Sequence, residues 1–258
     1  MAHQETLYYV RPAPLAPRAA HVTRPGERVF VWLGGAAFVT ALGFCAYSYL
    51  VTFSSGVAST SMARGSAALD NLRLAANVAL FSLFAAHHSL FARDSVKARL
   101  VQIVPDRLMR SFYVWTASLL LIFVCALWRP IGRDVYEVTG WQANVHAAVQ
   151  LAGLAIIAAS VRAIDPLELA GIRRDPSRTN LQITGPYRWV RHPLYLGWML
   201  AVFGAAHMTA DRLAFAAITS VYVIVAVPWE ERALERTFPE SYRRYKEEVR
   251  WRVVPYVY

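Results

Sequence analysis

The stretch of sequence that decides the fold is VFVWLGGAAFVTALGFCAYSYLV, residues 29–51. It runs for 23 residues without a charged side chain. As an α-helix it is roughly 34 Å long, which is enough to cross the hydrocarbon core of a bilayer. The sequence therefore predicts a transmembrane helix at this position.

Five further apolar runs predict additional crossings. They cover residues 74–91, 111–128, 145–161, 194–208 and 213–229. The last two are short and lie close together in the sequence, so we expect them to form a tight helical hairpin. The predicted fold is an all-α polytopic membrane bundle of about six transmembrane helices, including this C-terminal hairpin.

The composition agrees with a membrane protein. Apolar residues make up 56% of the 258-residue chain and charged residues only 17%, against about 45–50% and about 25% in soluble domains. The mean hydropathy is +0.31. Cys45 and Cys125 each lie inside an apolar run, which argues against a disulfide framework and against a CxxC metal or redox motif.

The net charge of +10 is explained by where Lys and Arg lie. With six crossings, 22 of the 27 basic residues fall on one face and 5 on the other. Cytoplasmic segments next to membrane helices collect basic residues, so we expect both termini in the cytoplasm. This distribution argues against a nucleic-acid partner and identifies the lipid bilayer as the environment.

The chain divides into three predicted parts. Residues 1–27 are rich in Pro and Arg and are expected to form a flexible basic cytoplasmic tail. Residues 28–164 hold the N-terminal transmembrane helices. Residues 165–258 combine the hairpin with aromatic, basic and acidic residues, and we expect the function to reside there.

The entrance to the hairpin is GPYRWVRHPLYLG, residues 185–197. Pro193 suits the first turn of a helix, so Arg191 and His192 are expected at a helix N-terminus near the membrane surface. Free N–H groups and the positive end of the helix dipole would attract a carboxylate or phosphate there. The alternative is an ordinary interfacial belt of aromatic and basic side chains.

Two adjacent carboxylates, Glu230 and Glu231, mark the exit of the hairpin. A short hairpin returns its end close to its beginning, so these acids are expected to face Arg191 and His192. An acidic and a basic wall together suit a zwitterionic small molecule. The alternative is a salt bridge that only locks the hairpin.

An amphipathic helix is predicted over residues 233–251, after the hairpin. Aromatic residues mark one of its faces and basic residues the other. Such a helix either lies on anionic lipid or folds over the polar corner as a lid, and the sequence favours neither.

The pair His87 and His88 ends the second apolar run. Adjacent helical residues point about 100° apart, so the two imidazoles are poorly placed to share one ion, and we predict no metal site. His88 is either a polar group on the substrate side or an interfacial His bonded to the backbone. Dinucleotide, P-loop and nucleophile-elbow motifs are absent from the sequence.

These motifs resemble the isoprenylcysteine carboxyl methyltransferase superfamily, which includes phospholipid methyltransferases. The resemblance covers about residues 181–256. It rests on the order and spacing of the following residues: Gly185-Pro186-Tyr187-Arg188, Arg191-His192-Pro193, Tyr195, Gly197, Glu230-Glu231, Phe238, Tyr242, Tyr245 and Val253-Val254-Pro255.

The N-terminal half is similar to the bacterial branch that contains methanethiol S-methyltransferases and NnrU-like proteins. The similarity is carried by residues 88–93, Arg110-Ser111-x-Tyr113, Trp128-Arg129-Pro130 and Gly171-Ile172-Arg173. One position departs from it. An Asn-His pair is expected in the thiol-methylating branch, and this chain has Asp165-Pro166 there. If that pair contacts substrate, the acceptor differs.

The resemblance implies an integral membrane enzyme that transfers a methyl group from S-adenosylmethionine to a small thiol or other lipophilic acceptor, in a bacterial inner membrane. His88 and Arg191 are the catalytic candidates, because a thiol gains from a base or a cationic neighbour. The alternatives are a non-catalytic NnrU-like accessory protein and an NADPH-dependent reductase. The implied cofactor residues are Tyr187, Arg191, His192, Pro193, Tyr195, Gly197, Glu230, Glu231 and Tyr245.

Overall fold

The computed structural model describes residues 24–55, 66–91, 94–173 and 181–258. The predicted tail over residues 1–27 lies almost wholly outside this part. The helices and strands, in chain order, are α1 Pro25–Tyr47, the π-helical turn η1 Ser48–Thr52, α2 Ala67–Phe91, α3 Asp94–Leu100, η3 Asp106–Leu108, α4 Met109–Ala126, β1 Asp134–Glu137, α5 Gly140–Ile164, α6 Pro166–Leu169, η4 Gly185–Arg188, α7 Pro193–Phe203, β2 His207–Thr209, α8 Ala210–Thr237 and α9 Pro239–Glu248.

The prediction of a polytopic helical membrane bundle is confirmed. Five helical segments are long and apolar enough to cross a membrane, and α1 with η1 forms the first of them. The fifth predicted crossing, residues 194–208, differs, because α7 has 11 residues and is only about 16 Å long. The apolar residues that follow α7 form a turn and strand β2 instead of continuing the helix.

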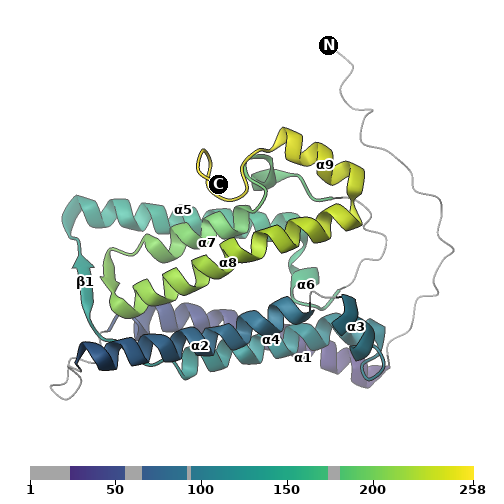
Figure 1. The fold of residues 1–258 in the computed structure, drawn as a ribbon, viewed down its shortest axis with the longest axis horizontal. Helices are drawn as coiled ribbons and strands as arrows, with labels where there is room; N and C mark the ends of the chain where they lie inside the picture. Colours follow the sequence, from purple (N-terminus) through teal and green to yellow (C-terminus); the bar gives the residue numbers. More distant parts are fainter. Residues whose placement is uncertain (1–23, 56–65, 92–93, 174–180) are drawn as a thin grey trace, which may run out of the picture.

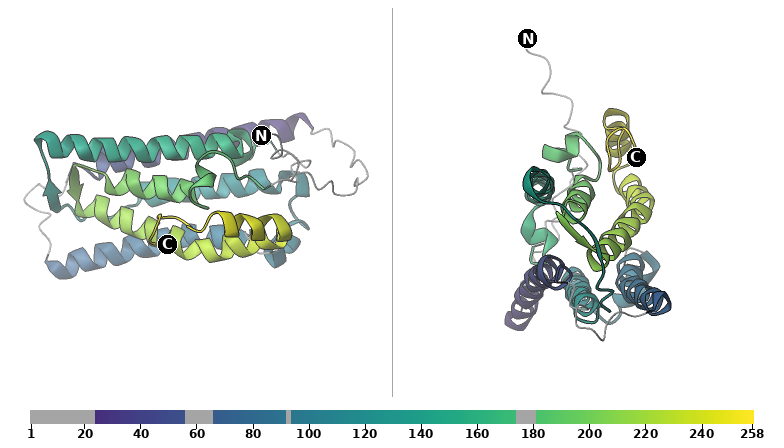
Figure 2. Two further views of the ribbon diagram at one scale, coloured as in Figure 1. Left: turned by 90° about the horizontal axis from the view of Figure 1, so that it is seen from above. Right: turned by 90° about the vertical axis from the view of Figure 1, so that its left-hand side faces the viewer.

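The helices form two layers (Figure 1). Helices α1, α2 and α4 make one layer, and α5, α7 and α8 make the other; the end-on view of Figure 2 separates them clearly. Aromatic rings join the layers: Phe53 packs 5.0 Å from Trp128 and 5.5 Å from Phe215, measured between ring centroids. Helices α3, α6 and α9 share one end of the bundle, so the most basic connections lie together there.

The opposite end is closed by a two-stranded ribbon that the sequence analysis did not predict. Strands β1 and β2 pair antiparallel, and buried charges fix the turn that follows. The Asp211 carboxylate accepts hydrogen bonds from Trp128 Nε1 and from the N–H groups of Ile131 and Gly132. Arg212 donates to backbone carbonyls of η1 and of His207. Both charges are therefore satisfied inside the protein.

The C-terminal helices differ from the prediction in their bounds. Helix α8 continues through Pro228 to Thr237, whereas its apolar run was expected to end at residue 229. Glu230 and Glu231 have partners inside the molecule, so they extend the helix instead of terminating it. Helix α9 is correspondingly short. Its apolar face packs on the protein, as a cluster of Tyr242, Tyr245 and Val249 with Leu181, Ile183, Leu234 and Phe238.

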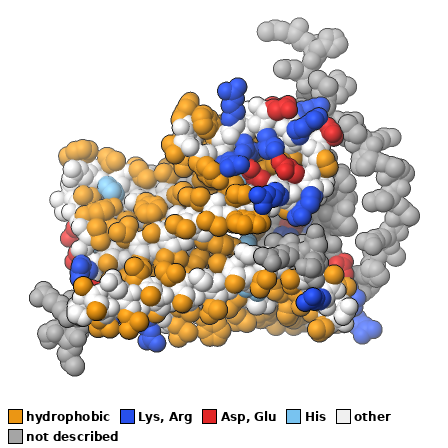
Figure 3. Space-filling view, in the orientation of Figure 1, with side chains coloured by type: hydrophobic (Ala, Val, Ile, Leu, Met, Phe, Trp, Pro, Cys, Tyr) orange, Lys and Arg blue, Asp and Glu red, His pale blue; other side chains and the backbone are white. Residues whose placement is uncertain are grey.

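This packing argues against one of the two roles considered for α9, attachment to lipid through its apolar face. A helix that uses its apolar side chains to bind lipid leaves them on the molecular surface. Tyr242 and Tyr245 are instead buried against the protein. The charged face of α9 points outward, where Figure 3 shows Lys, Arg, Asp and Glu gathered on an otherwise apolar surface.

Helices α5 and α7 approach each other most closely at two glycines. A Cβ on Gly197 would lie 2.7 Å from the carbonyl oxygen of Gly153, and a Cβ on Gly153 would lie 2.6 Å from the carbonyl oxygen of Gly197. Small residues permit such backbone contact between membrane helices. Gly197 therefore sets the packing of α7 on α5.

We expect Gly197→Ala to lower the thermal stability of the detergent-solubilised protein, by about 1–3 kcal/mol, because the added methyl group overpacks this contact. Gly43→Ala is the matched control, since nothing lies within 4 Å of a Cβ at that position. Unfolding curves of the two variants test the prediction. Equal stability of both would contradict it.

Candidate active site

A buried ion pair forms the centre of the candidate site. Arg191 Nε donates to Glu231 Oε1 at 2.7 Å, and both side chains are only 7% exposed. The Arg191 Nη1 group also donates to the carbonyl oxygens of Val249 and Arg250, at 2.7 and 2.8 Å. One guanidinium thus connects the start of α7, the end of α8 and the chain that follows α9.

Glu231 has further cationic neighbours. Arg252 Nε lies 3.2 Å from Glu231 Oε2, and His192 Nε2 lies 3.5 Å from Oε1. Arg252 also donates to the hydroxyl of Tyr258 at 3.1 Å. Glu231 is therefore surrounded by positive charge, and its removal would leave buried cations without a partner.

Glu230 has a different environment from Glu231. Its side chain is 36% exposed, so part of the carboxylate remains available. The Tyr195 hydroxyl donates to Oε1, and His192 Nδ1 lies 3.5 Å from Oε2. The rings of His192 and Tyr195 stack at 5.4 Å with 5° between their planes. These contacts orient Glu230 without saturating it.

The acids determine the charge of their neighbours. Burial favours the neutral form of His192, but hydrogen bonds and charge from Glu230 and Glu231 raise its pKa above the usual 6.5. Burial, with the charge of Glu230, raises the pKa of Tyr187 to about 12. The corner therefore presents a protonated phenol and an imidazolium beside the carboxylates.

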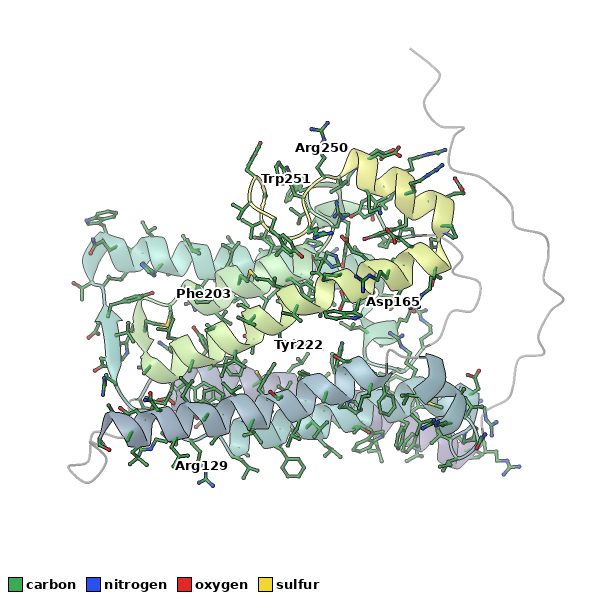
Figure 4. All side chains as sticks on the ribbon, viewed as in Figure 1. Arg129, Asp165, Phe203, Tyr222, Arg250 and Trp251 are labelled. Atoms are coloured by element: carbon green, nitrogen blue, oxygen red, sulfur yellow. The ribbon has the colours of Figure 1, made fainter. Side chains whose placement is uncertain are left out.

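One expectation about this corner is wrong. The N–H groups of Arg191 and His192 were expected to be free at a helix N-terminus. They donate instead to the carbonyl oxygens of Trp251 and Arg252, at 2.9 and 2.7 Å. The C-terminal segment folds back over the start of α7 and uses these two donors, so they are not available to an anion. Figure 4 shows Trp251 and Arg250 above this part of the bundle.

Three of the predicted cofactor residues have mainly structural contacts. Gly197 packs on α5, as described above. Pro193 is buried in the first turn of α7. The Tyr245 hydroxyl donates to the carbonyl oxygen of Tyr187 at 2.6 Å, which fastens α9 to η4.

The predicted catalytic residue His88 lies on α2, in the other layer. Its Nδ1 atom forms a hydrogen bond with the Tyr113 hydroxyl. The His88 ring lies 6.0 Å from that of Tyr222, nearly perpendicular to it, and interacts electrostatically with Glu230. The charge of Glu230 therefore acts on a residue of the other layer. Arg191, the other catalytic candidate, has Nε and Nη1 bound within the ion-pair centre.

The sequence analysis did not single out Arg252 or Tyr222, and it gave Tyr113 no role in the site. Arg252 stands directly before the Val253-Val254-Pro255 run, which was the one indication in the sequence that this segment matters. Tyr113 follows Arg110-Ser111 in another matching motif. Tyr222 lies in an apolar run with no motif around it, so the sequence offered no indication of its position.

The residue pair that departs from the thiol-methylating branch has a structural role. Asp165 accepts a hydrogen bond from Leu167 N at 3.0 Å and so caps α6. It also pairs with Arg173. Burial raises the pKa of Asp165, but the hydrogen bonds from Leu167 N and Arg173, with the charge of Arg173, together lower it below its usual value. Asp165 therefore holds α6 and Arg173 in place.

Comparison with known proteins gives consistent results. The phospholipid methyltransferase family matches residues 144–241, a span that includes both Arg191 and Glu231. Methanethiol S-methyltransferase 2 of Bradyrhizobium diazoefficiens is 36% identical over 83% of this chain and 82% of its own length. A Pseudomonas methanethiol S-methyltransferase is 30% identical over 88% of this chain and 93% of its own length.

Methanethiol S-methyltransferase 1 of the same Bradyrhizobium is 36% identical, over 67% of this chain and 64% of its own length. The matched region therefore spans just under two-thirds of that relative. No solved structure matches this chain.

The contacts of His192 predict a pH-dependent contribution to stability. Because its pKa is raised in the folded protein, the pairing contributes fully below the ordinary pKa of 6.5 and is lost as the pH rises through the raised value. We expect the unfolding temperature of the wild type to fall as the pH rises above the ordinary His pKa of 6.5, and His192→Gln to remove most of this slope.

His207→Gln is the control, because His207 pairs with Asp134 at the other end of the bundle. It should retain the slope of the wild type. A slope that persists unchanged in His192→Gln would refute the contribution of this pairing.

Proposed function

Because the chain belongs to the family of membrane methyltransferases that contains the methanethiol S-methyltransferases, we propose that it transfers a methyl group from S-adenosylmethionine to a small thiol. The resemblance found in the sequence is confirmed at the level of the family. The five membrane-spanning helices make the chain an integral membrane protein.

The bacterial inner membrane, with both termini in the cytoplasm, is part of this proposal. It is supported by the bacterial relatives and by the 22 to 5 division of basic residues between the two faces. This division still applies with five long helices, because α7 and strand β2 together return the chain to the end of the bundle where β1 lies (Figure 1). In this orientation the Arg191–Glu231 centre lies toward the cytoplasm, where a water-soluble methyl donor is available.

The observation that carries the proposed function is the unequal pair of acids. Glu231 is buried and saturated by Arg191, Arg252 and His192. Glu230 is partly exposed beside it. S-adenosylmethionine carries a carboxylate, an amine and a ribose diol, and such a ligand matches a site of mixed charge. Glu230 suits the amine or the diol.

The residues around the acids fit the same ligand. The contact of His192 Nε2 with Glu231 is long, at 3.5 Å, and lacks good hydrogen-bond geometry, so in this proposal the protonated ring also supplies positive charge for the ligand's carboxylate. The Tyr187 and Tyr195 rings supply aromatic surface next to Glu230. In this proposal Glu231 holds the site together, and Glu230 and His192 bind the donor.

When bound, the donor supplies an electrophilic methyl group on a sulfonium. The chain must align an acceptor in line with that methyl group, at about 3 to 3.5 Å, and must remove the thiol proton. His88 is the candidate for this proton, because it is the imidazole that reaches Glu230 from the opposite layer. Arg191 acts indirectly, through Glu231.

We expect Glu230→Gln to weaken the binding of S-adenosylhomocysteine at least about tenfold, as loss of a charged hydrogen bond does, with little change in unfolding temperature. Glu231→Gln should instead lower the unfolding temperature, because it leaves buried cations unpaired. Titration calorimetry and thermal unfolding in detergent measure the two effects. Glu240→Gln on the exposed surface of α9 is the matched control.

Unchanged affinity in Glu230→Gln would remove this carboxylate from the donor site. If the same variant failed to fold, the division of roles between the two acids would be wrong.

The acceptor is tested by incubating the purified protein with methyl-labelled donor and a panel of thiols, phenols, isoprenoid compounds and amines. We expect label in the thioether products, detected by mass spectrometry. Label confined to phospholipid or to an amine would refute the thiol assignment while leaving the methyltransferase family intact.

A further inference from the structure

A second polar cluster lies inside the bundle, on the layer that does not carry the ion-pair centre. It consists of His87 and His88 on α2 and Tyr113 on α4. His88 Nδ1 bonds to the Tyr113 hydroxyl, whose distance to Nε2 is 3.3 Å. The His87 ring stacks on Tyr113 at 5.5 Å with 14° between the planes. Polar side chains within membrane helices are costly and usually functional.

This cluster faces the proposed donor site across Tyr222 of α8. The rings of His88 and Tyr222 lie 6.0 Å apart at 87°, and Phe81 and Phe84 contact the other sides of Tyr222. Figure 4 shows Tyr222 between α8 and α2. Glu230 interacts electrostatically with Tyr113 and Tyr222 as well as with His88. The carboxylate that borders the donor site therefore also borders this cluster.

The aromatic rings and the negative charge around His88 indicate which kind of methyl acceptor can bind there. The aromatic rings of Phe84, Tyr113 and Tyr222 lie next to His88, and the carboxylate of Glu230 acts on it electrostatically. Aromatic faces favour apolar groups and cationic sulfur, whereas a carboxylate disfavours an anionic ligand. A small neutral thiol fits this environment better than an acceptor that carries a phosphate.

We infer that Tyr113 is a positioning residue that holds the imidazole of His88 to accept the proton of a neutral thiol bound between His88 and Tyr222. In the tautomer that serves this role, the Nδ1–H group of His88 donates to the Tyr113 oxygen, which leaves the lone pair of Nε2 to accept the thiol proton. This inference rests on the proposed function and specifies the acceptor side of that site.

The proposed reaction consists of a proton transfer to His88 and a methyl transfer to the thiol sulfur. The S–H proton of the thiol passes to His88, and the sulfur forms a bond to the methyl carbon as the bond from that carbon to the sulfonium breaks. The products are a thioether and S-adenosylhomocysteine. His88 then releases its proton to water, and the carboxylate of Glu230 stabilises the imidazolium in the meantime.

The test compares Tyr113→Phe and His88→Gln with the wild type on two thiols: an alkanethiol, and an aromatic thiol that is already ionised at neutral pH. With the alkanethiol we expect kcat to fall about tenfold in Tyr113→Phe and about a hundredfold in His88→Gln, as for loss of a general base. With the ionised thiol the loss should largely disappear in both variants.

A merely structural role would lower the rates on both thiols equally, and that outcome would overturn the inference. The pH profile gives an independent measure. Tyr113→Phe should shift the rising limb of kcat/KM for the alkanethiol, and His88→Gln should replace that limb with the ionisation of the free thiol. Unchanged pH profiles of kcat/KM in the two variants would also overturn the inference.

Two further variants separate effects on the fold and on donor binding. Tyr136→Phe removes a hydroxyl that donates to the carbonyl of Ala205 at the far end of the bundle, and it should retain full activity. Tyr222→Leu should raise the KM for the thiol several-fold without weakening the binding of S-adenosylhomocysteine. Weakened donor binding with an unchanged thiol KM would place Tyr222 outside the acceptor site.

Failure of this inference is distinguishable from failure of the proposed function. If the proposed function is wrong, the wild type methylates no thiol at all. If only the inference is wrong, the wild type methylates thiols, and the variants of Tyr113 and His88 do so without any dependence on thiol acidity.

Discussion

The buried pair of Arg191 and Glu231 is the interaction on which the rest of the structure depends. A charge at this depth is tolerated only when it is paired and hydrogen-bonded. Arg191 meets that requirement with one carboxylate and two carbonyl oxygens from the segment after α9. Satisfying this single guanidinium therefore fixes the relative positions of α7, α8 and the C-terminal segment.

The same constraint makes the two neighbouring acids unequal. Adjacent residues of a helix point in different directions, so only Glu231 turns fully into the cationic centre. Glu230 remains partly exposed and is bonded to Tyr195. It lies where the two helical layers meet and interacts with residues of both. In the proposed function this is the position that a carboxylate between donor and acceptor must occupy.

Some features of the site followed from the sequence and others did not. The hairpin brought the Arg191 corner and the acids together as expected, because a short antiparallel pair of helices returns its end to its start. The free N–H donors expected at Arg191 and His192 are absent, because residues 251 and 252 bond to them. No local sequence pattern indicates that Arg191 and His192 bond to a segment about sixty residues further along the chain.

By itself, the sequence determined the membrane fold, since the length of an apolar run limits where a chain can cross lipid. It also determined the order of the charged motifs, from which the corner follows. Only the tertiary structure decided which acid is exposed, that Arg252 joins the centre, and that Tyr113 meets His88. Those contacts depend on how each helix is rotated and how closely it packs. Gly153 and Gly197 set that geometry by direct backbone contact, which hydrophobic periodicity does not encode.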